Sequence, residues 1–96
     1  MTNPMRHISP LAQMPIHGTK RAPPLFKGEY KQVVRFIEHY CHLLEYYQVT
    51  SDQDQCRGII EYCSQDVEDF ILSCPDYIVP NWEALKEEIL KYYDAE

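Results

Sequence analysis

Long apolar runs are missing from this sequence. No stretch approaches the roughly 18 consecutive apolar residues that a membrane-spanning helix requires, and no basic-then-apolar leader opens the chain. We therefore expect an intracellular, cytoplasmic protein with no membrane partner. Glycine is scarce as well, with 3 residues in 96, and none of them belongs to a glycine-rich phosphate loop. Paired catalytic carboxylates and aspartic-protease triplets are also absent, so we do not expect an enzyme.

Spacings typical of metal sites are absent too. His39, Cys41 and His42 lie close together in the sequence, but no pair has the CxxC or HxxxH spacing that zinc sites normally show. At about 100° per residue on a helix, Cys41 points away from the face that the two histidines share. We therefore predict no metal site and no cofactor.

Cysteine is present in an even number, which allows disulfides. Three of the four cysteines fall on the apolar faces of predicted helices, where a free cysteine behaves as a small hydrophobic residue. We expect buried thiols, with disulfides or a metal site as the alternatives. The four residues are Cys41, Cys56, Cys63 and Cys74.

Positive charge is scarce beyond the first part of the chain. Residues 1–27 hold four basic residues and no acid, whereas residues 28–96 hold all fifteen acids and five bases, a net charge of −10. So acidic a segment repels phosphate, and we expect no direct nucleic-acid binding by it. The eight tyrosines have mainly acidic neighbours, which favours positions at a protein interface or the edge of a core over base stacking.

Residues 1–22 are predicted to be a disordered, basic, proline-rich tail, because they show no helical or alternating period. Pro23 and Pro24 then fix an extended lead into Leu25 and Phe26, and Gly28 gives the following turn its freedom. We predict that residues 23–26 lie extended against the helices, with Phe26 in an apolar groove. Phe26 is then either a staple that closes the core or the occupant of a regulatory groove.

Strong helical periodicity is present after residue 28. Five apolar residues recur at steps of four, three, four and three, which places them on one face of a helix over residues 29–47. They are Val33, Ile37, Tyr40, Leu44 and Tyr47. Similar patterns predict helices over residues 51–63, 65–74 and 81–93, the last of them anchored on the first by Trp82. The sequence therefore predicts an all-α fold, a small four-helix bundle over residues 23–96.

Polar residues mark the starts of the three later helices. Thr50 is expected to cap the second helix in a capping box with Gln53. Ser64 is expected to cap the third helix and Asn81 the fourth. Residues 76–80 are predicted to be a loop that is too apolar to be fully exposed.

Two motifs at the ends of the helical part resemble the Gag capsid protein of gypsy-type LTR retrotransposons. The P-x-F-x-G motif that precedes the first helix in that family matches Pro24, Phe26 and Gly28. The family's W-x-x-(L/F/M)-x-x-x-(L/I)-x-x-x-(F/Y) helix matches Trp82, Leu85, Ile89 and Tyr93. Arg57 and Cys63 match the family's second helix more weakly. The likeness covers residues 22–96 and is greatest to the amino-terminal capsid lobe of fungal members.

The resemblance implies a structural lobe that self-associates during particle assembly, so its partner is another copy of itself. The alternative is a domesticated Gag-derived module that binds an extended apolar peptide. A full Gag also carries a second capsid lobe and a zinc knuckle, which this sequence lacks, so we expect an excised lobe or a truncated host gene. The predicted interaction residues are Leu25, Phe26, Tyr30, Val33, Tyr40, Tyr47, Tyr77 and Trp82.

Overall fold

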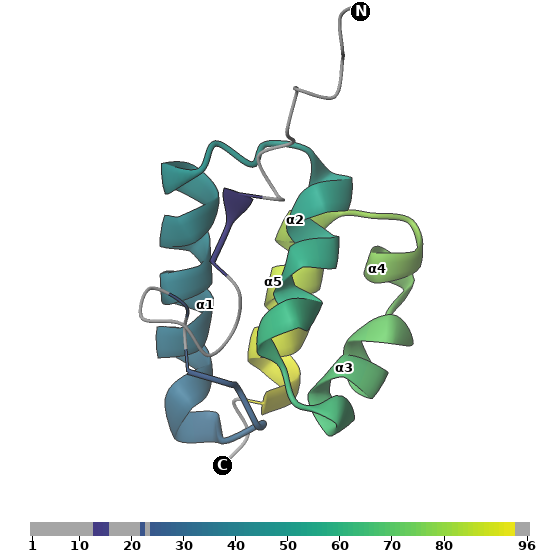
Figure 1. Cartoon of the computed structure of the whole chain (residues 1–96). Helices are drawn as coiled ribbons and strands as arrows, with labels where there is room; N and C mark the ends of the chain where they lie inside the picture. Colours follow the sequence, from purple (N-terminus) through teal and green to yellow (C-terminus); the bar gives the residue numbers. More distant parts are fainter. Residues whose placement is uncertain (1–12, 16–21, 23, 94–96) are drawn as a thin grey trace, which may run out of the picture.

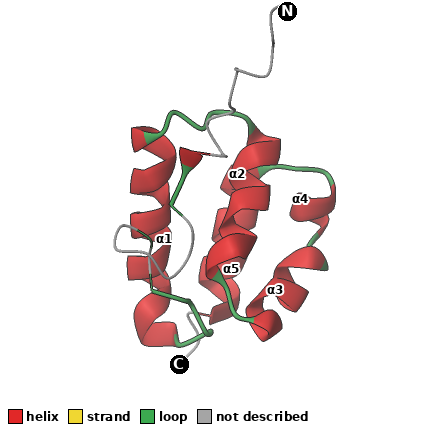
Figure 2. Ribbon diagram, in the orientation of Figure 1, coloured by secondary structure: helices red, strands yellow, loops and turns green. Residues whose placement is uncertain are grey.

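The computed structural model describes residues 13–15, 22 and 24–93, and these form an all-α domain (Figures 1 and 2). The described part contains five α-helices and no strand, and a short 3₁₀ turn follows the second helix. The α-helices are α1 (Tyr30–Tyr46), α2 (Asp52–Ile59), α3 (Gln65–Leu72), α4 (Pro75–Ile78) and α5 (Trp82–Tyr93), and the 3₁₀ turn is η3 (Ile60–Tyr62). The all-α prediction is confirmed, but the predicted number of four helices is wrong.

The long helix α1 is the element that the sequence describes best. Its predicted apolar stripe is buried as far as Leu44, and only Tyr47, just past the end of the helix, is half-buried. Phe36 and Leu43 widen the buried face. α1 packs mainly on α5, where the Tyr40 and Trp82 rings meet edge to face with centroids 5.4 Å apart. Trp82 therefore anchors α5 on α1, as predicted.

The second predicted helix is shorter than expected and begins later. Ser51, rather than Thr50, caps α2, because the Ser51 hydroxyl oxygen accepts from the Asp54 N–H at 3.2 Å. Val49, the residue before Thr50, is buried, and its N–H donates to the carbonyl of Leu44 at 2.9 Å. That bond continues the turn after α1 up to residue 49 and leaves the next helix to start past Thr50. The capping-box prediction is therefore wrong.

The predicted caps of the last two long helices differ in outcome. The Asn81 side-chain oxygen accepts from the Ala84 N–H at 3.2 Å at the start of α5, so that cap is confirmed. Ser64 does precede α3, but its hydroxyl makes no capping bond and is buried without a partner. Its backbone N–H donates instead to the carbonyl of Phe26 at 2.9 Å. The prediction of a side-chain cap for α3 is therefore wrong, because the Ser64 backbone is bound to Phe26 and its hydroxyl does not turn to the helix.

Residues 75–78 form the additional helix α4 where the sequence predicted a loop. Pro75 occupies its first turn, where a missing N–H costs nothing. Tyr77 is half-buried, but Ile78 and Val79 are 68% and 74% exposed. The short helix turns Tyr77 toward the core and the next two residues outward. The expectation that this apolar stretch is not purely exposed therefore fails for Ile78 and Val79.

Some residues that the sequence assigns to the tail contact the helical domain. Met14 and Ala22 are buried, and the Tyr62 hydroxyl donates to the carbonyl of Pro15. At these positions the structure differs from a disordered tail, because apolar side chains join the core. Residues 1–12 and 16–21 of the predicted tail, and Pro23 of the predicted extended segment, lie outside the described residues.

Candidate protein-interaction groove

The lead-in segment (residues 24–29) is held to the helical domain by its backbone. The Phe26 N–H donates to the carbonyl of Tyr62, and the Ser64 N–H donates to the carbonyl of Phe26, both at 2.9 Å. These two bonds form an isolated parallel bridge between Phe26 and Cys63. The lead-in segment is therefore paired, at one residue, with the chain that joins η3 to α3.

The Phe26 side chain enters the core between two other rings. It stacks on Phe36 with ring centroids 4.9 Å apart and meets Tyr93 edge to face at 5.3 Å. Only 2% of Phe26 is exposed. The prediction that Phe26 inserts between the helices is confirmed, and its burial together with its paired backbone matches the staple better than a removable occupant.

Gly28 allows the chain to turn from the lead-in segment into α1. Its φ is +96°, a left-handed conformation that residues with a Cβ rarely adopt. A Cβ at this position would lie 3.1 Å from the Tyr93 Cε1 atom. The turn therefore needs glycine both for its backbone conformation and for the close approach of the Tyr93 ring.

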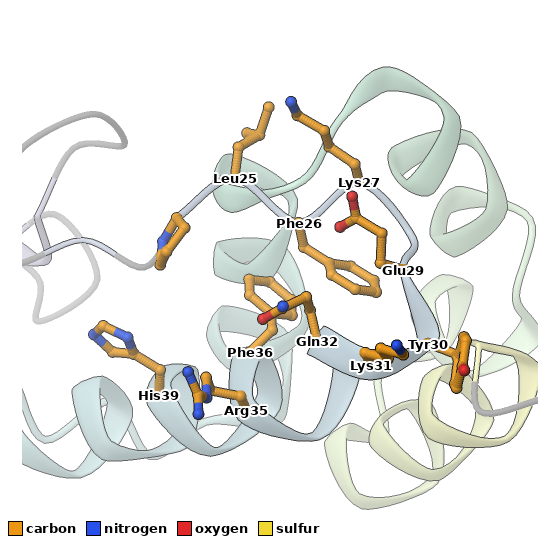
Figure 3. Close-up of a pocket in the computed structure, with 11 residues that line it drawn as sticks. Leu25, Phe26, Lys27, Glu29, Tyr30, Lys31, Gln32, Arg35, Phe36 and His39 are labelled. Atoms are coloured by element: carbon orange, nitrogen blue, oxygen red, sulfur yellow. The ribbon is translucent and has the colours of Figure 1, made fainter.

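A groove of about 630 Å³ separates the lead-in segment from the exposed side of α1 (Figure 3). The lead-in segment forms one wall and the first two and a half turns of α1 form the other. The buried rings of Phe26 and Phe36 lie between the two walls. The lining residues are Pro24, Leu25, Phe26, Lys27, Glu29, Tyr30, Lys31, Gln32, Arg35, Phe36 and His39.

The charge of this groove is opposite to that of the domain. Lys27 lines one wall, Lys31 and Arg35 line the other, and all three are exposed. They are half of the six lysines and arginines between residues 24 and 93, whereas only one of the thirteen acids in that range, Glu29, lines the groove. None of the three cations makes an ion pair with a described residue, since the ion pair of the described part joins Lys86 and Glu83. The groove therefore presents positive charge that no described carboxylate pairs with, beside the buried rings, although the Lys31 ammonium group also lies 6.0 Å from the centroid of the Tyr30 ring.

The structure brings together three of the eight predicted interaction residues. Leu25, Phe26 and Tyr30 line the groove, and of these Leu25 and Tyr30 are exposed by 40% and 48%. Tyr47 and Tyr77 are half-buried on other parts of the domain. The other three residues lie in the core, where they can support a surface but cannot touch a partner. They are Val33, Tyr40 and Trp82.

The tyrosines were predicted to lie either at a protein interface or at the edge of the core, and Tyr40 lies inside the core. It is fully buried, and its hydroxyl donates to the carbonyl of Gln55 at 2.7 Å. Burial, and to a smaller degree the charge of an ionised Tyr62 hydroxyl, raises the pKa of the Tyr40 phenol well above its usual range. Its polar atom is thus satisfied inside the core, so the residue joins α1 to α2 and presents no polar group to a partner.

Sequence reasoning missed the charged part of the groove. Lys31, Arg35 and His39 follow one another at intervals of four residues, a spacing that places them in one row along α1. Both Lys31 and Arg35 fall off the apolar stripe of the helix predicted over residues 29–47, where charged side chains are expected to face water. The spacing of four residues between these basic side chains, close to the Pro24–Phe26–Gly28 motif, could have predicted a positively charged surface.

The cysteines are placed as small hydrophobic residues. All four thiols are free, with Cys41 half-buried and the other three buried. Burial, and to a smaller degree Glu68, raises the pKa of Cys63 to about 12, so this thiol stays protonated and unreactive near neutral pH. Within the described part of the chain, no three His, Cys, Asp or Glu side chains are grouped so that they could hold a metal ion.

A second apolar surface lies away from the groove. Leu72, Ile78 and Val79 are 41%, 68% and 74% exposed, and the first two line a shallow depression of about 410 Å³ beside α2. Figure 1 shows α1 on one side of the molecule and α3 and α4 on the other, with α2 and α5 between them. Exposed apolar side chains that cluster in this way mark surfaces suited to protein contact.

Comparisons of the chain with models of protein families, with curated protein sequences and with solved structures find no match. Among the described helices, none combines the length and the apolar character needed to cross a membrane.

Proposed function

We propose that this domain is a structural lobe of the Gag capsid type that self-associates in an assembly. The observation that carries the proposal is the presence of two different contact surfaces on one small domain. The groove beside α1 is concave and bears positive charge, whereas the exposed residues Leu72, Ile78 and Val79 form an apolar surface on the other side. A shell or chain of identical subunits requires such unlike surfaces, because each copy must contact more than one neighbour.

The residues that carry the family resemblance have joint packing roles, which supports the proposal. Phe26 of the first motif contacts Tyr93 of the second motif, and a Cβ at Gly28 would lie 3.1 Å from the same ring. The two ends of the helical part thus form one unit. That unit fixes the lead-in segment beside α1 and so shapes one wall of the groove.

Sedimentation velocity over a wide concentration range tests self-association. We expect the weight-average sedimentation coefficient of the full chain to rise with concentration. The double variant Ile78→Ser/Val79→Ser should weaken the rise, whereas Tyr46→Ser, which alters a residue that is 69% exposed elsewhere on the surface, should leave it unchanged. A sedimentation coefficient that stays monomeric at all concentrations would contradict the proposal.

A second candidate function is the binding of an extended apolar peptide in the groove. The observation in its favour is the exposed apolar lining of the groove by Leu25 and Tyr30 next to the buried rings. The probe is a peptide with the sequence of residues 22–26, Ala-Pro-Pro-Leu-Phe, added to the isotope-labelled chain. This candidate predicts saturable NMR shifts at Tyr30, Gln32 and Arg35, and smaller shifts with the same peptide ending in serine. Equal or absent shifts would argue against it.

A further inference from the structure

The groove is positively charged although the domain as a whole is acidic. This difference restricts what the groove can bind. Lys31 and Arg35 are exposed, lie one helical turn apart and have no ion-pair partner among the described residues. The exposed Lys27 lines the facing wall. A partner that places carboxylates over α1 would neutralise these charges, and an apolar side chain next to the carboxylates would lie against the apolar lining of the groove. The groove therefore suits a partner that has an acidic surface and an adjoining apolar residue.

The outer face of α3 has this chemistry on the same chain. Asp66, Asp69 and Leu72 are exposed and follow one another at intervals of three residues, so they form one row on the helix surface. No lysine, arginine or histidine occurs between Arg57 and Lys86. The row of two aspartates followed by a leucine is therefore free of competing positive charge.

The two rows also agree in spacing. Side chains three or four residues apart on a helix have Cβ atoms about 5–6 Å apart, so the Asp66–Asp69 pair and the Lys31–Arg35 pair have nearly equal separations. An α3 helix laid along α1 can thus place both aspartates against both cations. Leu72, which is 41% exposed, then follows one turn further along, beside the apolar lining of the groove.

We propose that the groove between the lead-in segment and α1 binds the Asp66–Asp69–Leu72 face of α3 from a second copy of this chain. This inference rests on the proposed self-association and identifies one of the contacts that produce it. Glu29, the single carboxylate of the groove, lies on the lead-in side, away from the Lys31–Arg35 row. The contact leaves each copy with an unused groove or an unused α3 face, so it can be repeated from copy to copy.

Charge reversal on either side of the contact provides the test. The variant Lys31→Glu/Arg35→Glu should lower the association constant at least tenfold, and so should Asp66→Lys/Asp69→Lys. Sedimentation velocity measures the association. The matched controls change net charge by the same amount on α5: Lys86→Glu/Lys91→Glu for the groove variant and Glu87→Lys/Glu88→Lys for the α3 variant. Both controls should associate like the unchanged chain, since all four positions lie outside the contact.

An equimolar mixture of the two reversed variants is the decisive measurement. Each variant alone pairs like charges, but in the mixture the unchanged acidic α3 of one variant meets the unchanged basic groove of the other. The reversed groove of the first variant likewise meets the reversed α3 of the second. The mixture should therefore associate about as strongly as the unchanged chain. Association should also weaken when the salt concentration is raised from about 0.1 M to about 1 M, which shortens the screening length from about 10 Å to about 3 Å.

The outcomes separate this inference from the proposed function. A chain that stays monomeric under all conditions overturns both. A chain that associates but ignores both reversals, or a mixture that fails to recover, overturns the α3 contact and leaves self-association standing. Loss of association on reversing the groove but not α3 also overturns the proposal, and assigns the groove to another acidic face of the second copy. The milder pairs Lys31→Gln/Arg35→Gln and Asp66→Asn/Asp69→Asn give the same comparison if circular dichroism shows that a reversed variant is unfolded.

Discussion

The ring of Phe26 stacks on the ring of Phe36, with centroids 4.9 Å apart and planes only 11° from parallel. The first ring belongs to the lead-in segment and the second to α1, so this pair joins the chain before the first helix to the helix itself. Phe26→Ala should lower the free energy of unfolding by about 3–5 kcal/mol, because it removes a buried ring and leaves a cavity. Denaturant unfolding followed by circular dichroism measures the change.

The neighbouring residue provides the control for Phe26. Leu25 is 40% exposed, and Leu25→Ala should change the free energy of unfolding by less than about 1 kcal/mol. If the Phe26 variant is as stable as the Leu25 variant, the lead-in segment does not contribute to the core. It would then be a displaceable ligand of the groove.

Trp82 should be the most sensitive position on α5. It is 4% exposed and meets the buried Tyr40 edge to face, so Trp82→Ala should cost about 3–5 kcal/mol. A loss of that size is a large part of the stability of a small domain, and the variant should be partly unfolded at room temperature. Tyr46→Ala, at a residue that is 69% exposed, is the control and should melt like the parent chain. A Trp82 variant that melts with the parent would mean that α5 packs in another way.

The sequence predicted best those features that depend on neighbouring residues alone. The apolar stripe of α1 could be identified because one helix face repeats every three to four residues. The cap at Asn81 was predictable for the same reason, because its bond reaches only three residues along the chain. Features of this kind need no knowledge of what lies across the core.

Several of the features that failed depend on contacts between distant segments. The capping hydroxyl of Ser64 is unused because its backbone is bound to Phe26, a residue far away in the sequence. Met14 and Ala22 join the core from a segment without any periodicity. The groove arises only when the lead-in segment folds back beside α1, so Leu25 and Tyr30 were predicted as single residues while its positive charge was not recognised.

Gly28 should be difficult to replace. Gly28→Ala would place a Cβ in a left-handed conformation and 3.1 Å from the Tyr93 ring, and we expect a loss of about 1–2 kcal/mol in the free energy of unfolding. Thermal denaturation measures it. Gln48, with φ of 58°, provides a control at which glycine is introduced. Gln48→Gly relieves backbone strain in the folded state but raises the conformational entropy of the unfolded state. Because these effects oppose each other, the free energy of unfolding should change by less than about 0.5 kcal/mol. Equal stability of the Gly28 variant and the parent would show that the turn can relax.

Cys41 should be the thiol that reacts first in the folded domain. It is half-buried, whereas Cys56, Cys63 and Cys74 are buried, and burial raises the pKa of all four thiols. A thiol-specific reagent should modify one cysteine at first and the others only as the domain unfolds. Cys41→Ser should abolish that first step. Because the thiols are free, a reductant should leave the melting temperature unchanged, and a marked fall would reveal a disulfide.

The domain should lose stability at alkaline pH. Burial raises the pKa of Cys63 from 9.0 to about 12, and burial together with Glu61 and Tyr47 raises that of Tyr62 from 10.0 to about 12. In both cases the folded state holds its proton more tightly than the unfolded state. The stabilisation is therefore complete below about pH 9 and is lost as the pH rises toward 12.

The size of this effect can be measured at Cys63. The Cys63 thiol donates to the carbonyl of Ile59 at 3.3 Å, and its ionisation should remove about 1.4 kcal/mol for each pH unit between the unfolded and folded pKa values. Urea unfolding at a series of pH values from neutral to alkaline measures the slope. Cys63→Ala should be less stable at neutral pH, because it leaves a small cavity, but should show a shallower alkaline decline. If the two chains decline in parallel above pH 9, Cys63 is not held in its protonated form by the fold, and the alkaline loss comes from the tyrosines.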